Sequence, residues 1–118
     1  MLNGKITCKA ITDQYYNKMQ VVYITASSLS EAESLAITLV EENLVACVNL
    51  FENVRSFYRW KGNLETSNEV VIIAKTTSDR LSSAIAKVEE IHSYSCPCVF
   101  ALDTSKVSIP FFNWITGM

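Results

Sequence analysis

The pattern of apolar and polar positions predicts strands and helices in the order β-α-β-β-α-β. The first clear strand is residues 20–25, where β-branched residues dominate. Ser30 and Glu33 then form an S-x-x-E pattern, which predicts a capping box at the start of a helix. Apolar residues recur at helical spacing in both predicted helices. They are Ala32, Leu35, Ala36, Leu39 and Val40 in the first helix, and Leu81, Ala84, Ile85, Val88 and Ile91 in the second.

Residues 44–69 are the most unusual stretch, because residues 46–61 can form one uninterrupted strand. At about 3.3 Å per residue such a strand extends roughly 50 Å, whereas strands usually contain about 5–6 residues. We therefore expect a bend or bulge, a partner subunit that covers the far end, or both. Read at alternate positions, one face of this strand is mainly apolar. It carries Ala46, Val48, Leu50, Val54, Tyr58 and Trp60.

The remaining elements complete a small antiparallel sheet. A return strand is predicted at residues 70–76, a fourth strand at 98–103 and a short fifth strand at 106–109. Pro110 fits the first turn of a short C-terminal helix. The order matches an α+β, ferredoxin-like fold with two helices on one face of the sheet. The strands are almost continuously apolar, although a sheet with one open face would alternate, so we expect subunit association.

Length and composition indicate one globular domain at residues 19–118, preceded by an N-terminal extension at residues 1–18 without a sustained period. Met19 is an alternative start, and the sequence alone does not decide between the two. The N-terminus lacks the apolar core of a secretory signal, and no apolar run approaches the roughly 20 residues of a membrane span. The four cysteines, Cys8, Cys47, Cys96 and Cys98, form no secreted disulfide framework, so we expect a reduced, cytoplasmic protein.

The formal net charge of −2 and the lack of a Lys/Arg-rich run argue against nucleic acid or a membrane surface as a partner. One segment, Tyr58-Arg59-Trp60-Lys61, interleaves aromatic and cationic side chains in a manner that can stack nucleobases. In a chain that is acidic overall, packing of this segment against a neighbouring subunit is the favoured interpretation.

Four residues are candidates for metal chemistry. Cys47 is either a small buried apolar residue or a thiolate ligand. His92, the only histidine, either caps a helix C-terminus or ligates a metal as neutral imidazole. Cys96 and Cys98 form a C-x-C close to His92, a combination that suits Cu(I) or Zn(II). The competing interpretation is one loop thiol and one core thiol, because a second cysteine pair for a closed site is missing.

No catalytic motif appears, so neither an enzymatic activity nor a required cofactor is expected. A thiol enzyme using Cys47 or Cys96 is the weakest hypothesis, because the sequence places no base beside either cysteine.

Two motifs, A-C-V-N at residues 46–49 and Y-x-W-x-G at 58–62, occur at a specific separation. With them the chain resembles the CutA family of divalent-cation-tolerance proteins over about residues 19–115. Further matches lie at residues 21–25, 39–41, 44–45, 75–76 and 113–115, and at Leu50, Val54, Ser56, Glu69, His92, Tyr94 and Pro97.

The resemblance implies a ferredoxin-like subunit in a tight homotrimer, linked to tolerance of copper and other divalent metals, without catalysis. Tyr58, Trp60 and Trp114 are the expected trimer contacts. The family trimer looks like that of nitrogen-regulatory signalling proteins. This gives an alternative function, a small-molecule-sensing trimer with clefts lined by Arg59, Lys61 and the loop that carries His92.

The resemblance also implies metal ligands at Cys47 and His92. The chain departs from the family pattern beside His92, with Ser93 where proline is usual, Ser95 where glutamate is usual and Cys98 where an acidic residue is common. A carboxylate expected to hold the metal is therefore missing. The expected ligands become His92, Cys96 and Cys98, with Cys47, and the metal is copper or zinc.

Overall fold

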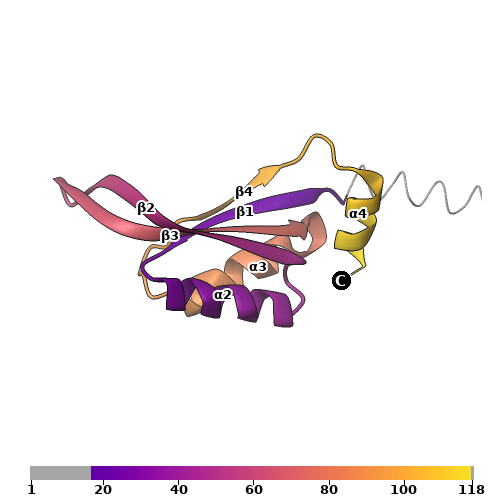
Figure 1. Ribbon diagram of the computed structural model, residues 1–118, viewed down its shortest axis with the longest axis horizontal. Helices are drawn as coiled ribbons and strands as arrows, with labels where there is room; N and C mark the ends of the chain where they lie inside the picture. The colour runs from indigo at the N-terminus through magenta and orange to yellow at the C-terminus, as the bar shows by residue number, and fades with distance from the viewer. Residues whose placement is uncertain (1–16, 118) are drawn as a thin grey trace, which may run out of the picture.

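The computed structural model describes residues 17–117. Within these residues, one antiparallel sheet has the strand order β2-β3-β1-β4 (Figure 1). The predicted ferredoxin-like α+β fold is confirmed. In chain order the elements are β1 (Met19–Ala26), α2 (Leu29–Glu41), β2 (Cys47–Trp60), β3 (Asn63–Thr77), α3 (Ser78–Ile91), β4 (Val99–Asp103) and α4 (Ile109–Thr116).

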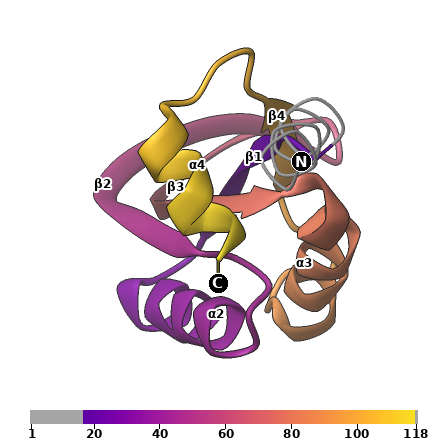
Figure 2. The same ribbon diagram turned by 90° about the vertical axis from the view of Figure 1, so that its right-hand side faces the viewer.

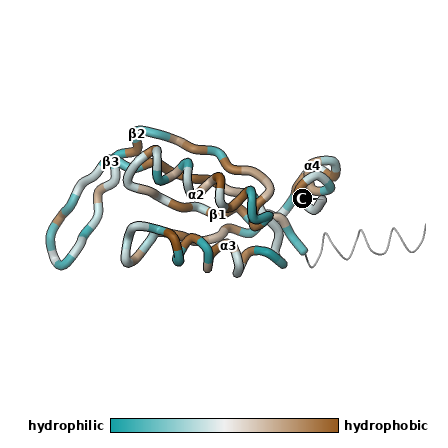
Figure 3. The backbone as a smooth tube through the Cα atoms, turned by 90° about the horizontal axis from the view of Figure 1, so that it is seen from below, coloured by the Kyte–Doolittle hydropathy of each residue, from teal (hydrophilic) through white to brown (hydrophobic). Residues whose placement is uncertain are grey.

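Helices α2 and α3 cover one face of the sheet (Figure 2), and they lie side by side when seen from that side (Figure 3). Their apolar stripes bury Leu35 and Leu39 of α2 and Val88 of α3 against Ile24 and Ile72 of the central strands. Burying each such side chain contributes about 1.5–3 kcal/mol. This core fixes the positions of the loops at the two ends of the sheet.

The N-cap of helix α2 lies two residues before the serine of the predicted capping box. Ser28 is the N-cap, and its Oγ accepts a hydrogen bond from the Glu31 amide at 3.2 Å. Glu31 in turn accepts hydrogen bonds from the amide and hydroxyl of Ser27. The box predicted at Ser30 and Glu33 was therefore wrong, because the S-x-x-E pattern also occurs two residues earlier, where the chain leaves β1.

The β2–β3 hairpin is long and contains a bulge, as expected from the length of the strand. Phe51 pairs with Val71 and Val54 with Glu69, so β2 has one extra residue at this point. Asn53 lies inside the bulge with φ 61°, a conformation that asparagine tolerates better than most residues. The hairpin extends beyond the helices at one end of the molecule (Figure 3), and α4 lies at the other end (Figure 1).

The bulge overturns the predicted single apolar face of β2. One extra residue reverses which face each later side chain occupies. Val48 and Leu50 pack against the core beneath the sheet. Beyond the bulge, Tyr58 pairs with Glu65 in the register that continues from Val71, and it therefore lies on the opposite face.

Two further strand predictions were wrong. The return strand begins at Asn63, seven residues before the predicted start at Val70, because the polar stretch between them pairs along its whole length with β2. The fifth strand predicted at residues 106–109 is a loop that ends as Ile109 enters α4. The described sheet consists of β2, β3, β1 and β4, and residues 106–109 do not pair with any of these strands. Pro110 lies at the start of α4, as predicted.

The face of the sheet opposite α2 and α3 carries exposed apolar side chains. Phe100 stacks on Tyr23 with ring centroids 5.0 Å apart, and Phe51 and Leu102 are 52% and 55% exposed. Sheet faces usually bury such residues. No helix within residues 17–117 has the length and apolar character needed to cross a bilayer. The predicted N-terminal extension, with Cys8, lies almost entirely outside the described residues.

Candidate functional site: an aromatic cavity beneath the hairpin

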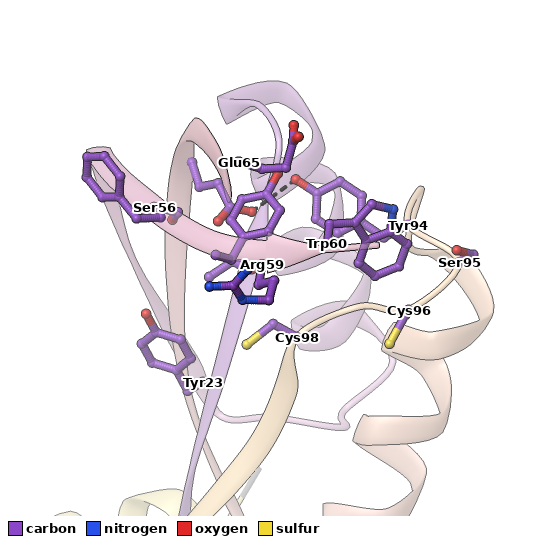
Figure 4. Close-up of a pocket in the computed structure, with 13 residues that line it drawn as sticks. Tyr23, Ser56, Arg59, Trp60, Glu65, Tyr94, Ser95, Cys96 and Cys98 are labelled. Carbon is purple, nitrogen blue, oxygen red and sulfur yellow. Dashed lines mark hydrogen bonds between the residues drawn. The ribbon is translucent and has the colours of Figure 1, made fainter. Parts of the chain in front are cut away.

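A cavity of about 670 Å³ lies between the far half of the β2–β3 hairpin, the end of β1 and the loop after α3. Figure 4 shows that its walls come from these three segments, which are distant in sequence. Its size is typical of a site for a small molecule. Aromatic rings form much of the wall: Tyr23, Phe57, Tyr58, Trp60 and Tyr94.

The charged lining groups of the cavity are mostly acidic. Glu65 and Glu69 supply carboxylates, and Arg59 supplies a guanidinium. The Arg59 Nη1 donates to the carbonyl oxygen of Gly62, 3.3 Å away in the hairpin turn. Gly62 has φ 83°, which glycine adopts without strain. Arg59, the one cationic residue that lines the cavity, thus already uses one of its hydrogen-bond donors on the hairpin turn.

His92 holds the loop that forms one wall. It is the C-cap of α3 rather than a residue of its last turn, and it is buried, with 8% exposure. Its Nε2 lies 2.7 Å from the carbonyl oxygen of Thr25, and the Tyr94 amide donates to Nδ1 at 3.0 Å. Because a carbonyl only accepts and an amide N–H only donates, the proton is on Nε2. Metal ligation by His92 stays a prediction, and it requires that one of these bonds break.

Glu31 ties the same loop to the start of α2. Its carboxylate accepts from the Ser93 amide at 2.8 Å and from the Ser93 hydroxyl at 3.0 Å. Burial alone would raise the pKa of Glu31, but the hydrogen bonds from Ser93 and Ser27 outweigh burial and lower the pKa below the usual value near 4.5. Ser93 is therefore part of a hydrogen-bond network with Glu31.

Tyr94 connects this network to the cavity. Its hydroxyl donates to Oε2 of Glu69 at 3.0 Å, which Figure 4 shows as a dashed line. Burial, the hydrogen bond to Glu69 and the negative charge of Glu69 raise the pKa of Tyr94 to about 12. The phenol therefore stays protonated at neutral pH and acts as a hydrogen-bond donor.

Cys96 and Cys98 both line the cavity, and both are exposed. Figure 4 shows them on the segment that runs past Arg59 and Trp60. Cys47 is half-buried and is not among the cavity residues; its cross-strand partner is Lys75. Residues 17–117 contain no group of three or more His, Cys, Asp or Glu side chains positioned to hold a metal. The predicted set of Cys47, His92, Cys96 and Cys98 is thus not gathered at one point.

The residues predicted as trimer contacts lie at two ends of the molecule. Tyr58 and Trp60 line the cavity on the hairpin, and Trp60 is 48% exposed. Trp114 lies on α4, is 56% exposed and stacks on Phe111 with ring centroids 5.9 Å apart. Their role in assembly stays a prediction.

The family model of the CutA1 divalent ion tolerance protein matches residues 20–118. The chain belongs to the CutA1 family. It is 40% identical over 94 residues to the divalent-cation tolerance protein CutA of Archaeoglobus fulgidus, covering 80% of this chain and 91% of that protein. The family resemblance seen in the sequence is thereby confirmed.

Solved CutA1 structures share the fold. The periplasmic divalent cation tolerance protein CutA of Archaeoglobus fulgidus superposes with a TM-score of 0.82 at 38% identity, over 84% of this chain and 96% of that one. The divalent ion tolerance protein CutA1 of Ehrlichia chaffeensis gives a TM-score of 0.83 at 29% identity, over 86% and 95% of the two chains. A relative in Arabidopsis thaliana, 33% identical over 80% of this chain and 52% of its own length, is chloroplastic. Family members thus occupy different compartments.

Sequence reasoning missed Glu69 and Glu31 as parts of the site. Both had a local signal. Glu69 is a charged residue directly before the apolar run of the return strand, and Glu31 completes the S-x-x-E pattern that begins at Ser28. The contact between Tyr94 and Glu69 joins residues 25 positions apart, and no local pattern predicts it.

Proposed function

We propose that this CutA1-family protein acts in tolerance to copper and other divalent metals, as a cytoplasmic homotrimer and without catalysis. Membership of a divalent ion tolerance family across residues 20–118 is the observation that carries the metal role. The long hairpin and the apolar uncovered face of the sheet support assembly, because an edge and a face of this kind are stabilised by a further subunit.

The proposed metal ligands are the thiolates of Cys96 and Cys98. Both sit on the wall of one cavity and both are exposed, so an ion can reach them. Thiolates select soft ions such as Cu(I) and also bind zinc. In this proposal, His92 does not bind the metal. It holds the loop after α3 in place through its hydrogen bonds with Thr25 and Tyr94.

Growth under copper stress tests the metal role. A bacterial strain that lacks its own CutA1 relative and is copper-sensitive should regain growth when it expresses this chain. The double variant Cys96→Ser/Cys98→Ser should fail to restore growth, and Cys47→Ser, the control outside the cavity, should succeed. Equal rescue by the double variant would rule out the thiolate pair, and no rescue by the unaltered chain would contradict the metal role itself.

A second candidate function is small-molecule sensing by the same trimer. The observation that favours it is the cavity of about 670 Å³ with its aromatic walls, which has the size and lining of a ligand site. A ligand at about 100 times its Kd stabilises the folded state by about 2.7 kcal/mol. A thermal-shift screen of charged metabolites in which no compound raises Tm would count against this candidate.

A further inference from the structure

The cavity is unusual in combining aromatic faces with a buried carboxylate. Glu69 is only 9% exposed and lines the cavity. Within residues 17–117, its carboxylate has one hydrogen-bond donor, the Tyr94 hydroxyl, and no ion pair with a basic side chain. A buried carboxylate with a single neutral partner is costly for the folded state. A cation beside it would offset that cost.

The charges around the cavity select against an anion. Glu65 and Glu69 outnumber the one basic lining residue, Arg59. The guanidinium of Arg59 also donates to the Gly62 carbonyl in the turn. An anionic ligand would approach two carboxylates, whereas a cationic ligand would be attracted by them.

The aromatic rings favour the same kind of ligand. Faces of tryptophan and tyrosine attract cations through the ring quadrupole, most strongly where water is excluded. Trp60, Tyr58 and Tyr94 supply such rings on the same cavity that holds Glu69. Their apolar area also favours a ligand with an organic body over a hydrated inorganic ion.

We propose that the cavity binds a small organic ammonium ion, with Glu69 as its counter-charge and with Glu65 and the rings of Tyr58, Trp60 and Tyr94 around it. This proposal rests on the second candidate function, that the cavity holds a small molecule. Cys96 and Cys98 line the same cavity, but the proposal does not use them, since Glu69 and the three rings are not metal ligands in the proposed function.

A series of three probes with the same body and different charge tests the proposal. Isothermal titration of the full-length assembled protein would use 3-phenylpropylammonium, the neutral 3-phenylpropanol and the anionic 3-phenylpropionate. The ammonium probe should bind at least about tenfold more tightly than the alcohol, and the carboxylate probe should bind most weakly. The variant Glu69→Gln should lose this preference while keeping Tm within a few degrees of the unaltered protein.

The matched control is Glu52→Gln, which removes the same charge from an exposed position on β2 that does not line the cavity. It should bind the ammonium probe as the unaltered protein does. Tightest binding of the carboxylate probe, or an unchanged preference in Glu69→Gln, would overturn the proposal while small-molecule sensing stands. If none of the three probes binds, the organic-cation site is rejected. Small-molecule sensing is then judged by the metabolite screen, and the metal role by its own experiment.

Discussion

His92 illustrates how one buried side chain can determine the shape of a site. Its two ring nitrogens connect the end of β1 to the loop after α3 through Thr25 and Tyr94. The sequence could identify His92 as a candidate ligand or cap, but it could not show that both nitrogens are already used. That depends on a backbone carbonyl 67 residues away.

Replacing His92 with leucine should destabilise the protein. The change leaves the Thr25 carbonyl and the Tyr94 amide without their partner, and each unsatisfied buried group costs about 1–3 kcal/mol. We expect the free energy of unfolding to fall by about 2 kcal/mol or more, measured by urea unfolding at fixed protein concentration. Ser95→Ala, at an exposed position in the same loop, should change it by less than about 0.5 kcal/mol. Equal stability of the two variants would contradict the structural role of His92.

Glu31 should make the protein less stable as the pH falls into the acid range. Its folded-state pKa is lowered, with burial opposed by stronger hydrogen bonds from Ser93 and Ser27. Its contribution is therefore fully present above the usual carboxyl value near 4.5 and is lost as the pH falls through the folded-state value. The Tm difference between the unaltered protein and Glu31→Gln should shrink from about pH 7 to about pH 3. A difference that is constant or grows in acid would show that the carboxylate charge is not what stabilises the loop.

For the β2–β3 hairpin, the sequence of β2 predicted some features of the strand but not others. The length of β2 was predicted from an over-long run without proline, and a bend or bulge was one of the expected consequences. The position of the bulge was not predicted, because the break in pairing between Phe51 and Val54 is set by the partner strand β3. Because the prediction did not include the extra residue of the bulge, it assigned Tyr58 and Trp60 to the wrong face of the sheet. Likewise, the polar first half of β3 shows no alternation of apolar and polar residues. It extends beyond the helices, so neither of its faces packs against the core.

The bulge itself can be tested at Asn53, whose φ of 61° favours asparagine or glycine. Asn53→Gly should leave Tm unchanged or slightly higher. Asn53→Val should lower the free energy of unfolding by about 1–2 kcal/mol, because a β-branched residue is strained in this conformation. Thermal unfolding of the two variants measures the difference. If valine is tolerated as well as glycine, the bulge is not held in the described conformation.

Within residues 17–117, exposed apolar side chains gather on the sheet face, the hairpin and α4, and further single ones lie on α2 and α3. Association of subunits would bury these surfaces, and the family resemblance suggests a trimer. The α+β fold and most strand and helix positions were predictable from periodicity alone. The cavity was not, because it forms only where the hairpin meets the loop after α3.

Introducing charge into the proposed contacts should weaken assembly. Trp60→Asp and Trp114→Asp place a carboxylate in surfaces proposed to be buried between subunits, and we expect a shift from trimer toward monomer in sedimentation velocity. Ile37→Asp, at an exposed apolar position of α2, is the control and should sediment as the unaltered protein does. Trimers of unchanged stability in both tryptophan variants would show that these residues are not at the interface.

Binding of copper by the cavity thiolates can be measured by titrating Cu(I) into the reduced, full-length protein. We expect that one Cu(I) binds per chain, that Cys96→Ser/Cys98→Ser removes this binding, and that Cys47→Ser retains it. Binding that survives the double variant, or a Kd weaker than about 100 μM for the unaltered protein, would contradict a copper site at these thiolates.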